Sequence, residues 1–524
     1  MSYPGIIYQN ANLLQCVTSG LALTDSRLSF VAVRGGRIVA IGPAEAASSM
    51  KGRGTRVVDC HGYTLLPGLV DAHCHFLALA SRLSAIDCGR ERASTIPQLV
   101  NIIAQESSKA RSKEWDGRGW IRAFGYDEFY LKEKHHPTRW DLDQVSLSYP
   151  VRLDHRTGHA MVLNSVAMSL LQITKDTSDP IDGVIQRDED SREPTGVLLE
   201  MARWVRNRLG HTRSEDEVRQ GARLASRCFL SKGVTSIQDA TPSNGPEQWD
   251  LFSELKGSGC LVPRVTMMVG ADCANTAKRA AMRSREETGL RLGATKIMVT
   301  LTTGALQPSE EELRELVLRE HSQGSQVAVH AVEAEAVEAV ADALLHAQSV
   351  ALRPDARHRI EHCSECPPHL VDKIAASGAV VVTQPGFICD VGERYASLAD
   401  ERFLPHLYPI ADLAAAGVLI GAGSDAPVTL PDPMASIYAA VTRMTSSGIC
   451  LGPGQGVPVE EAIVMHTRGG AFASFEEHRK GTIKEGNLAD FVLLEQDPTA
   501  VEPGALRDIR PLMTVVNGEV VWQA

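Results

Sequence analysis

The sequence lacks an excess of positive charge, and it lacks any long hydrophobic run. Its 53 lysines and arginines are outnumbered by 64 aspartates and glutamates, which leaves a net charge of −11. Because phosphate groups are bound by clustered positive charge, this balance argues against nucleic acid or an anionic membrane surface as a partner. No apolar stretch reaches the length needed to span a bilayer. The first residues show no basic segment followed by an apolar one, so no secretion signal is expected.

The cysteines do not form the pattern of a disulfide framework. There are eleven of them, an odd number, scattered singly through a long chain. This usage predicts a reduced protein of the cytoplasm. The pair Cys363-Ser-Glu-Cys366 has no second pair that could complete a zinc site, so no function is assigned to it. The bulk composition, 44% hydrophobic and 22% charged residues, is that of a globular protein long enough for more than one domain.

Short strands are predicted at both ends of the chain. Residues 29–34 and 37–41 are apolar runs that flank Gly35-Gly36, which indicates a hairpin. Near the other end, the pair Asn517-Gly518 indicates a second hairpin. We expect residues 1–65 and 475–524 to meet in one small β-sandwich domain.

Between the two ends, strand-like apolar runs alternate with helical stretches such as 310–321 and 333–347. This alternation predicts an α/β fold of parallel βα units. The strand-like runs also end in polar or metal-capable residues, and a TIM barrel builds its active site at the carboxyl ends of its strands. These runs are 233–239, 294–299, 326–330, 358–362, 378–383 and 418–425.

The spacing of these strand ends fits a (β/α)8 barrel. Lys296 and His330 are 34 residues apart, His330 and His362 are 32 apart, and His362 and Asp425 are 63 apart. If His75 ends strand 1, the other four end strands 4, 5, 6 and 8. The 221 residues between His75 and Lys296 exceed the roughly 100 that three units need. We therefore predict a barrel domain at 66–474 with an α/β insertion at about 80–215.

The tripeptide His73-Cys74-His75 is the strongest chemical signal. Two histidines at i and i+2 on a strand point to the same face, so they can present two imidazoles to one metal ion. His330, His362 and Asp425 are predicted at the same barrel mouth. Each of these residues alone could be a packed core histidine or a turn-capping aspartate, but together they predict a metal site. Imidazole and carboxylate ligands suit Zn²⁺, with Mn²⁺, Co²⁺, Ni²⁺ or Fe²⁺ as alternatives.

Several motifs resemble those of a known family. The run Pro67-Gly-Leu-Val-Asp-Ala-His73-Cys-His75 resembles the first-strand motif of the amidohydrolase superfamily. Other stretches resemble its YtcJ-like branch, also called amidohydrolase family 3, and they include 137–143, 158–165, 194–200, 359–362 and 423–427. The resemblance runs from about residue 30 to the end of the chain. It implies a distorted TIM barrel that hydrolyses a carbon–nitrogen bond in a small amide, N-formyl or carbamate substrate, as the N-substituted formamide deformylases do.

The resemblance also implies roles for individual residues. Lys296 would be carbamylated by CO₂ and would bridge two metal ions, unless it reaches the surface or pairs with an acid. Asp425 would take a proton from the metal-activated water and pass it to the leaving amine. A second metal, His362 or His159 would polarise the carbonyl group. His159 would face the substrate from the insertion, with Arg152, His155 and Glu200 as weaker candidates.

One departure from the branch leaves a second function open. The branch typically follows its strand-5 histidine with Ala-Ile-Gly-Asp, whereas this chain has His330-Ala-Val-Glu333. The pattern His-x-x-Glu resembles that of the superfamily's deaminases of heterocyclic bases, where one metal suffices and the glutamate shuttles protons. Alternatively, Glu333 is an acid in the first turn of the following helix. A metal-free scaffold homologue is the remaining alternative, and a homodimer is the default expectation for assembly.

Overall fold

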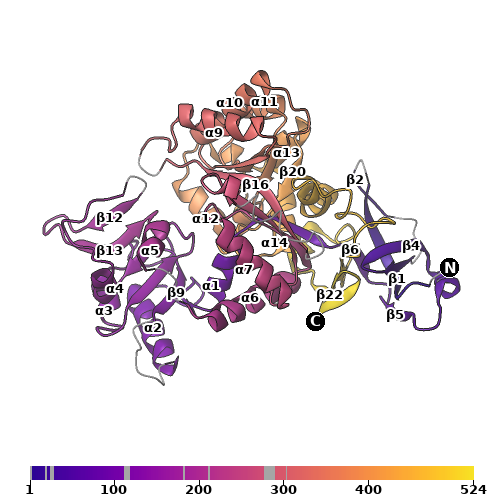
Figure 1. Ribbon diagram of the computed structural model, residues 1–524, viewed down its shortest axis with the longest axis horizontal. Helices are drawn as coiled ribbons and strands as arrows, with labels where there is room; N and C mark the ends of the chain where they lie inside the picture. The colour runs from indigo at the N-terminus through magenta and orange to yellow at the C-terminus, as the bar shows by residue number, and fades with distance from the viewer. Residues whose placement is uncertain are drawn as a thin grey trace. The chain divides into compact units, whose positions relative to one another are not determined.

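The computed structural model describes residues 3–17, 20–23, 29–110, 119–180, 183–209, 213–276, 289–301 and 304–524. The chain divides into two compact units (Figure 1). The first unit consists of Met1–His75, Ser226–Leu301 and Leu306–Ala524, and the second of Phe76–Ala225 with Thr302–Ala305. Each unit is described by itself below.

Eight parallel strands form the centre of the first unit. In sheet order they are β7 (Leu69–Cys74), β14 (Val234–Asp239), β15 (Arg264–Gly270), β16 (Leu290–Met298), β17 (Val327–Ala331), β18 (Arg359–His362), β19 (Val380–Thr383) and β20 (Ile420–Ala422). The segment after β20 is hydrogen-bonded to the end of β7, which brings the last strand next to the first. The Asp425 amide donates to the His73 carbonyl at 2.7 Å, and the His75 amide donates to the Ala426 carbonyl at 2.7 Å. The approach is so close that a Cβ at Gly423 would lie 2.5 Å from the His73 nitrogen. The strands therefore form a distorted TIM barrel, as predicted.

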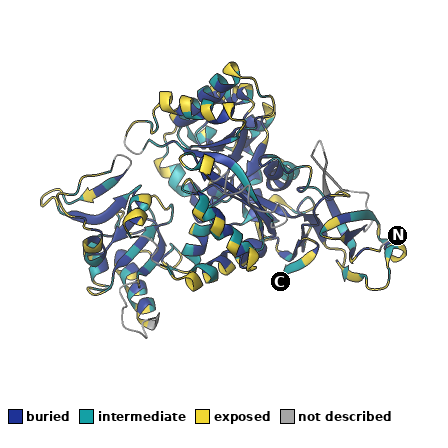
Figure 2. Ribbon diagram, viewed as in Figure 1, coloured by how far each residue is buried: buried dark blue, intermediate teal, exposed yellow. Residues whose placement is uncertain are grey.

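The barrel strands are apolar because both of their faces are covered. Every residue of β7 and of β18 is buried, and Figure 2 shows the same dark interior along the neighbouring strands. Outside the sheet, α9 (Glu310–Ser322), α10 (Ala334–Val350) and α11 (Pro368–Ser377) pack against one another in sequence order (Figure 1). The two helices predicted at 310–321 and 333–347 are α9 and α10.

Among the residues of this unit that the structure describes, the remaining helices are short apart from α7 and α12. They are η1 (Ala44–Met50), α7 (Pro246–Gly257), α12 (Gly386–Leu398), η3 (Leu404–His406), α13 (Ile410–Ala415), α14 (Pro433–Thr442), η4 (Pro453–Gln455), α15 (Val459–Val464), η5 (Met465–Gly469), α16 (Gly470–Phe472) and η6 (Pro503–Asp508). One barrel strand, β15, was not among the predicted strand ends. This strand ends at Gly270, so it carries no polar side chain at its carboxyl end.

Strands from the two ends of the chain join in one nine-stranded sheet. Its members are β1 (Ile6–Val17), β2 (Gly20–Leu23), β3 (Ser29–Arg34), β4 (Arg37–Pro43), β5 (Arg56–Asp59), β6 (Thr64–Pro67), β21 (Phe491–Leu494), β22 (Pro511–Val516) and β23 (Glu519–Gln523). Antiparallel pairing of β6 with β21 joins the N-terminal and C-terminal parts. Both predicted hairpins are present, as β3–β4 and β22–β23. The sheet belongs to the same compact unit as the barrel, so the predicted domain limits at 65 and 475 stay predictions.

The second unit contains a mixed sheet of six strands. In sheet order they are β12 (Val184–Arg187), β13 (Pro194–Leu199), β11 (Ala160–Leu163), β10 (Val151–His155), β9 (Ile121–Tyr126) and β8 (Ile86–Asp87). The helices are α1 (Phe76–Leu83), α2 (Ile96–Ala110), α3 (Arg139–Asp143), α4 (Ser165–Leu170), α5 (Ala202–Leu209) and α6 (Glu215–Leu230), the last of which continues into the first unit. The helix predicted at 95–112 is α2, and Ser112 lies outside the described residues.

The ten cysteines whose side chains the structure describes are all free thiols. Among the described residues, none of the helices has both the length and the apolar character needed to cross a membrane.

A buried histidine pair links α9 to the barrel through a defined chain of hydrogen bonds. The Val327 amide donates to His358 Nδ1 at 3.1 Å, so the proton of a neutral His358 lies on Nε2. That nitrogen contacts His321 Nδ1 at 2.8 Å, and His321 Nε2 contacts the Ala351 carbonyl at 2.6 Å. Burial lowers the pKa of His358 to about 3, and the neighbouring charges of His321 and Arg353 act in the same direction. The arrangement therefore requires a neutral His358.

Acid is expected to destabilise the protein through this pair. As the pH falls below about 6.5, the unfolded chain binds a proton at His358, while the folded chain does not until about pH 3. The free energy of unfolding should therefore fall by about 2 kcal/mol between pH 7 and pH 5 from this residue alone. Urea unfolding at both pH values checks this. His358→Gln, which can keep both hydrogen bonds without titrating, should lose that share of the pH dependence, whereas His369→Gln on the exposed side of α11 should retain it.

Candidate metal centre

The six residues predicted as metal ligands lie at the carboxyl ends of four barrel strands and in the segment that follows β20. His73 is near the end of β7 with His75 directly after it, Lys296 is in β16, and His330 is in β17. His362 is the last residue of β18, and Asp425 follows β20 by three residues. All six belong to the first unit. The barrel therefore brings together residues that are up to 352 positions apart in the chain.

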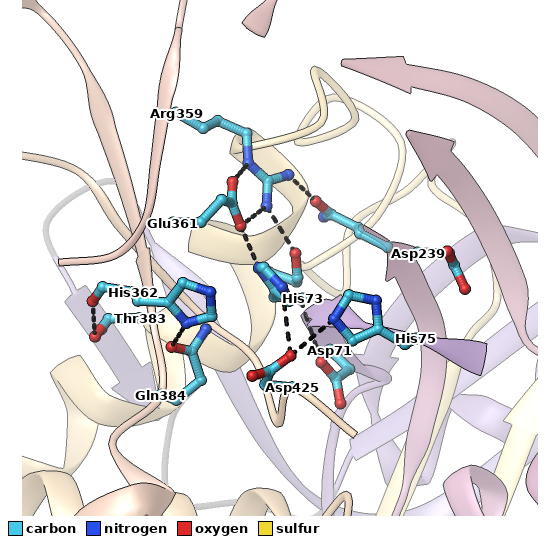
Figure 3. A network of polar contacts seen from close by, with 12 residues as sticks. Asp71, His73, His75, Asp239, Arg359, Glu361, His362, Thr383, Gln384 and Asp425 are labelled. Atoms are coloured by element: carbon cyan, nitrogen blue, oxygen red, sulfur yellow. Dashed lines mark hydrogen bonds and ion pairs between the residues drawn. The ribbon is translucent and has the colours of Figure 1, made fainter. Parts of the chain in front are cut away.

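His73, His75 and Asp425 are the most closely grouped of the six. Figure 3 shows the two imidazoles turned toward the carboxylate. Asp425 Oδ1 lies 3.0 Å from His75 Nε2 and 3.5 Å from His73 Nε2. One ligand atom from each of the three residues lies within 4.8 Å of the other two. This geometry is that of three ligands around one cation.

The neighbours of the histidines hold their rings so that Nε2 faces the centre. His73 Nδ1 contacts Glu361 Oε2 at 2.5 Å, and because a carboxylate can only accept, the imidazole proton lies on Nδ1. His362 Nδ1 contacts Gln384 Oε1 at 2.7 Å in the same manner. The Nε2 lone pairs of both rings are thus available to a metal, which is how second-shell partners set the tautomer of metal-binding histidines.

The other two imidazoles complete the group. His75 Nδ1 contacts Thr241 Oγ1 at 3.0 Å, just beyond the end of β14. The ring centroids of His330 and His362 are 4.4 Å apart, and those of His362 and His73 are 4.8 Å apart. Four imidazoles therefore form a continuous group around one end of the barrel.

The carboxylate that holds His73 is itself held by an arginine. Arg359 donates through Nε to Glu361 Oε1 at 2.6 Å and through a terminal nitrogen to Glu361 Oε2 at 2.9 Å (Figure 3). The same guanidinium donates to the Ala72 carbonyl at 2.8 Å. Arg359 and Glu361 are 1% and 0% exposed. Burial would raise the pKa of Glu361, but the charges of Arg359 and His73 hold it well below its usual range.

Lys296 is the least satisfied member of the group. Its side chain is 2% exposed, and Nζ has no hydrogen-bond partner among the described residues. Burial lowers the pKa of Lys296 to about 8, although the charges of Glu361 and Asp425 oppose this effect. An unpaired ammonium in such a place is costly. A buried amine that faces acidic and imidazole groups therefore fits a residue that is to be converted into an anionic metal ligand.

The protonation states also suit a metal. Burial lowers the pKa of His73 to about 3, with a further contribution from the charge of Lys296. Burial would raise the pKa of Asp425, but the hydrogen bond from His75 and the charges of the surrounding histidines hold it far below its usual range. Neutral imidazoles and an ionised carboxylate are the forms that bind a cation. The donor set of nitrogen and carboxylate oxygen fits a divalent transition metal.

Sequence comparison assigns the family. The model of the family described as "Amidohydrolase family" matches residues 56–522. The chain belongs to the amidohydrolase family. It is 28% identical to an N-substituted formamide deformylase of Arthrobacter pascens, over 97% of this chain and 98% of that one. It is 25% identical to the putative amidohydrolase YtcJ of Bacillus subtilis, over 90% of this chain and 91% of that one.

Solved structures agree on the fold of this amidohydrolase. An uncharacterised metal-dependent hydrolase from Pyrococcus horikoshii superposes with a TM-score of 0.75 at 21% identity, over 95% of this chain and 99% of that one. The zinc complex of atrazine chlorohydrolase TrzN from Arthrobacter aurescens superposes with a TM-score of 0.56 at 14% identity, over 99% of this chain and 95% of that one. At these identities the likeness concerns the barrel fold alone. Family membership makes the chain a metal-dependent hydrolase that acts on carbon–nitrogen bonds.

Of the predicted substrate contacts of this amidohydrolase, His159, Arg152 and Glu200 lie in its second unit and Glu333 lies in its first. His159 Nδ1 contacts Glu200 Oε1 at 2.8 Å, and Arg152 Nε donates to both oxygens of Asp154 at 2.8 and 3.0 Å. The role of His159, Arg152 and Glu200 toward a substrate therefore stays a prediction. His155 contacts Glu128 at 2.9 Å in the same unit. Glu333 is the residue before α10 and makes no capping hydrogen bond, so its expected place in the first turn of that helix is off by one position.

Sequence reasoning missed the residues that orient the histidines. Glu361, Arg359 and Gln384 were not among the predicted site residues, although 359–362 was noted as a family motif. The alternation of a strand places Arg359 and Glu361 on one face, and that spacing was an available signal for an ion pair. For Gln384 and Thr241 the sequence carries no comparable pattern, because each contacts a histidine from a different strand.

Proposed function

We propose that this chain hydrolyses the carbon–nitrogen bond of a small amide, N-formyl or carbamate substrate, with two zinc ions bridged by a carbamylated Lys296. The observation that carries the proposal is the buried amine of Lys296, which has no hydrogen-bond partner among the described residues and is close enough to His73, His362 and Asp425 to interact with them electrostatically. The similarity to a formamide deformylase over nearly the whole of both chains supports the substrate class.

The residues of the chain have distinct tasks in this reaction. A bound divalent metal lowers the pKa of water so that hydroxide is available near neutral pH. His73 and His362, with their Nδ1 positions held by Glu361 and Gln384, direct Nε2 lone pairs toward the centre, and Thr241 contacts Nδ1 of His75. Asp425, ionised and beside His75, accepts the proton from the attacking water and delivers it to the nitrogen that leaves. The carbon–nitrogen bond then breaks to release an amine and a carboxylate.

Metal content and the state of Lys296 test this proposal together. The protein, purified without chelator or metal-affinity resin and supplied with Zn²⁺ and bicarbonate, should contain about two metal ions per chain. Mass spectrometry of the peptide that holds residue 296, under conditions that preserve carbamates, should show the added mass of one CO₂. Lys296→Met, which replaces the amine with an apolar side chain of similar length, should retain the fold and lose at least one metal. About one metal in the wild type, with an unmodified Lys296, would contradict the bridged pair.

Glu333 separates amide hydrolysis from deamination of a heterocyclic base. In the amide hydrolase Glu333 has no part in the proton transfer, so Glu333→Gln should keep kcat within about twofold of the wild type, the usual tolerance of a residue outside the reaction. In a one-metal deaminase with Glu333 as the proton shuttle, the same change should lower kcat by roughly 10² to 10⁴. Kinetics on one N-formyl amine and one aminated heterocycle decide between the two reactions.

We also propose that the enzyme works in a reducing compartment such as the cytoplasm, because ten of its cysteines are free thiols. The expectation of a homodimer stays a prediction, and light scattering on the purified chain tests it.

A further inference from the structure

Two acidic residues and a histidine meet where two neighbouring strands of the second unit end. Asp127 and Glu128 directly follow β9, and His155 is the last residue of β10. The two strands are parallel, and His155 is the register partner of Tyr126. Because parallel strands end at the same edge of a sheet, the carboxylates after one strand come to lie beside the imidazole that ends the other. All three residues belong to the second unit, whereas the metal centre of the barrel belongs to the first.

The imidazole of His155 faces both carboxylates. Its Nε2 atom lies 2.9 Å from Glu128 Oε2 and 3.7 Å from Asp127 Oδ1. One ligand atom from each of the three residues lies within 4.8 Å of the other two. The ligand atoms of a tetrahedral zinc ion, each about 2.0 to 2.1 Å from the metal, lie about 3.3 Å from one another. The two distances from Nε2 lie on either side of this value, so little movement is needed to enclose an ion.

The ring nitrogen that faces the carboxylates is left without a hydrogen bond. His155 is 4% exposed, and its Nε2 makes no hydrogen bond with any described residue although Glu128 Oε2 is 2.9 Å away. The oxygen therefore lies to the side of the direction that an N–H bond would take. A metal ion fits this arrangement, because it occupies the direction of the Nε2 lone pair and keeps its other ligands to the side.

The outer contacts of these side chains also suit a metal. His155 Nδ1 lies 2.8 Å from Thr157 Oγ1, which can accept a proton from it, and 3.3 Å from the Thr157 amide, which donates to it in the other tautomer. The hydroxyl contact is the shorter, and a proton on Nδ1 makes the Nε2 lone pair available. Asp127 Oδ1 accepts a hydrogen bond from the Phe129 amide at 3.0 Å, which fixes the carboxylate and leaves that oxygen a second lone pair.

Two other basic side chains approach the carboxylates from greater distances. His136 Nδ1 lies 3.6 Å from Glu128 Oε2, and Arg156 Nε lies 3.9 Å from Asp127 Oδ2. Arg156 is thus beside the oxygen of Asp127 that does not face His155. Neither side chain comes as close to a carboxylate as His155 Nε2 does.

We propose that Asp127, Glu128 and His155 bind one divalent transition metal ion, in addition to the metal of the barrel. One imidazole and two carboxylates suit zinc, with an open position for water or a further ligand. The ion would fasten the segment after β9 to the end of β10 and so stabilise the second unit. The proposal does not depend on the reaction proposed above.

Counting metal ions in matched variants tests the site. The full-length protein is freed of metal with a chelator, returned to chelator-free buffer and titrated calorimetrically with Zn²⁺, with the thermal midpoint as a second readout. The wild type should bind one zinc ion more per chain than His155→Gln or Glu128→Gln. Because each variant loses a ligand, its affinity at this site should fall by more than the roughly 10- to 100-fold that loss of an outer partner costs. This difference between wild type and variant measures the site whatever number of ions the barrel binds.

The matched control is His135→Gln, which removes an imidazole from an exposed position of the same unit and should bind as many zinc ions as the wild type. Zinc should also raise the thermal midpoint of the wild type and of this control by more than that of the two ligand variants. Glu128→Gln preserves the size of its side chain, so it carries the test if His155→Gln does not fold. Equal numbers of ions in the wild type and both ligand variants would overturn the proposal and leave the three residues as an ion pair alone. An equal loss in His135→Gln would overturn it as well.

Discussion

Asp425→Asn is expected to retain metal and to lose turnover by about 10² to 10⁴, the usual contribution of general acid–base catalysis. The carboxylate lies 3.0 Å from His75 Nε2, and its pKa is held far below the ordinary value, so it is ionised and able to accept a proton at neutral pH. An asparagine keeps the shape and one oxygen donor but cannot take up that proton. The effect should appear in kcat and in kcat/KM alike, because the lost interaction belongs to the transition state.

Measuring kcat and metal content on the same preparation separates the two functions of Asp425. Asp372→Asn, the same change on the exposed side of α11, serves as the matched control and should behave as the wild type. Loss of metal from Asp425→Asn in proportion to the loss of activity would show that the carboxylate acts as a ligand only. Unchanged activity would exclude it from the reaction.

The second large effect is expected at Glu361, which does not face the substrate in the proposed mechanism. Its Oε2 atom lies 2.5 Å from His73 Nδ1 and keeps the imidazole proton on that nitrogen. Arg359 donates a hydrogen bond to the same carboxylate. Glu361→Gln should lower metal affinity by about 10- to 100-fold, as is usual for loss of a second-shell partner. It should also destabilise the fold by about 3 to 5 kcal/mol, because Arg359 is left as a buried charge without its carboxylate.

A second variant distinguishes the positioning role from the structural one. Combining Arg359→Met with Glu361→Gln removes both charges, so much of the stability should return while metal affinity stays low. Glu476→Gln is the matched control. Glu476 is a buried acid that contacts Lys480 at 2.6 Å and Arg291 at 2.9 Å, and Arg291 lies near the start of β16, at the opposite end of the barrel from the metal centre. Its loss should cost stability and leave metal affinity unchanged. Recovery of metal affinity in the double variant would contradict the positioning role.

The positions of the residues predicted as metal ligands could be read from the sequence because the spacing along a βα barrel is regular. Lys296, His330, His362 and Asp425 follow one another at one or two βα units, and the structure places them at strands 4, 5 and 6 and just after strand 8. β15 has no such signal, because its last residue is Gly270 and a pattern of polar strand ends does not include it. The protonation sites of the histidines could not be read from the sequence. They depend on contacts such as that of His362 with Gln384, which only the packed barrel creates.

The insertion predicted at about 80–215 overlaps the second compact unit, and its limits stay a prediction. The surplus of residues between His75 and Lys296 indicated where it lies, and the second unit covers 76–225 with 302–305.

The pairing of β6 with β21 has a consequence for how the protein is made. Pro67 is the register partner of Phe491, so a ribosome must add about 420 further residues, which takes about 20 to 85 seconds at common elongation rates, before that edge of β6 can be covered. During this interval an apolar strand edge is exposed to other chains. Nascent-chain binding by chaperones, and aggregation when synthesis outpaces them, should therefore concentrate on the N-terminal strands. Supplying residues 475–524 as a separate peptide would be a direct way to shorten that exposure.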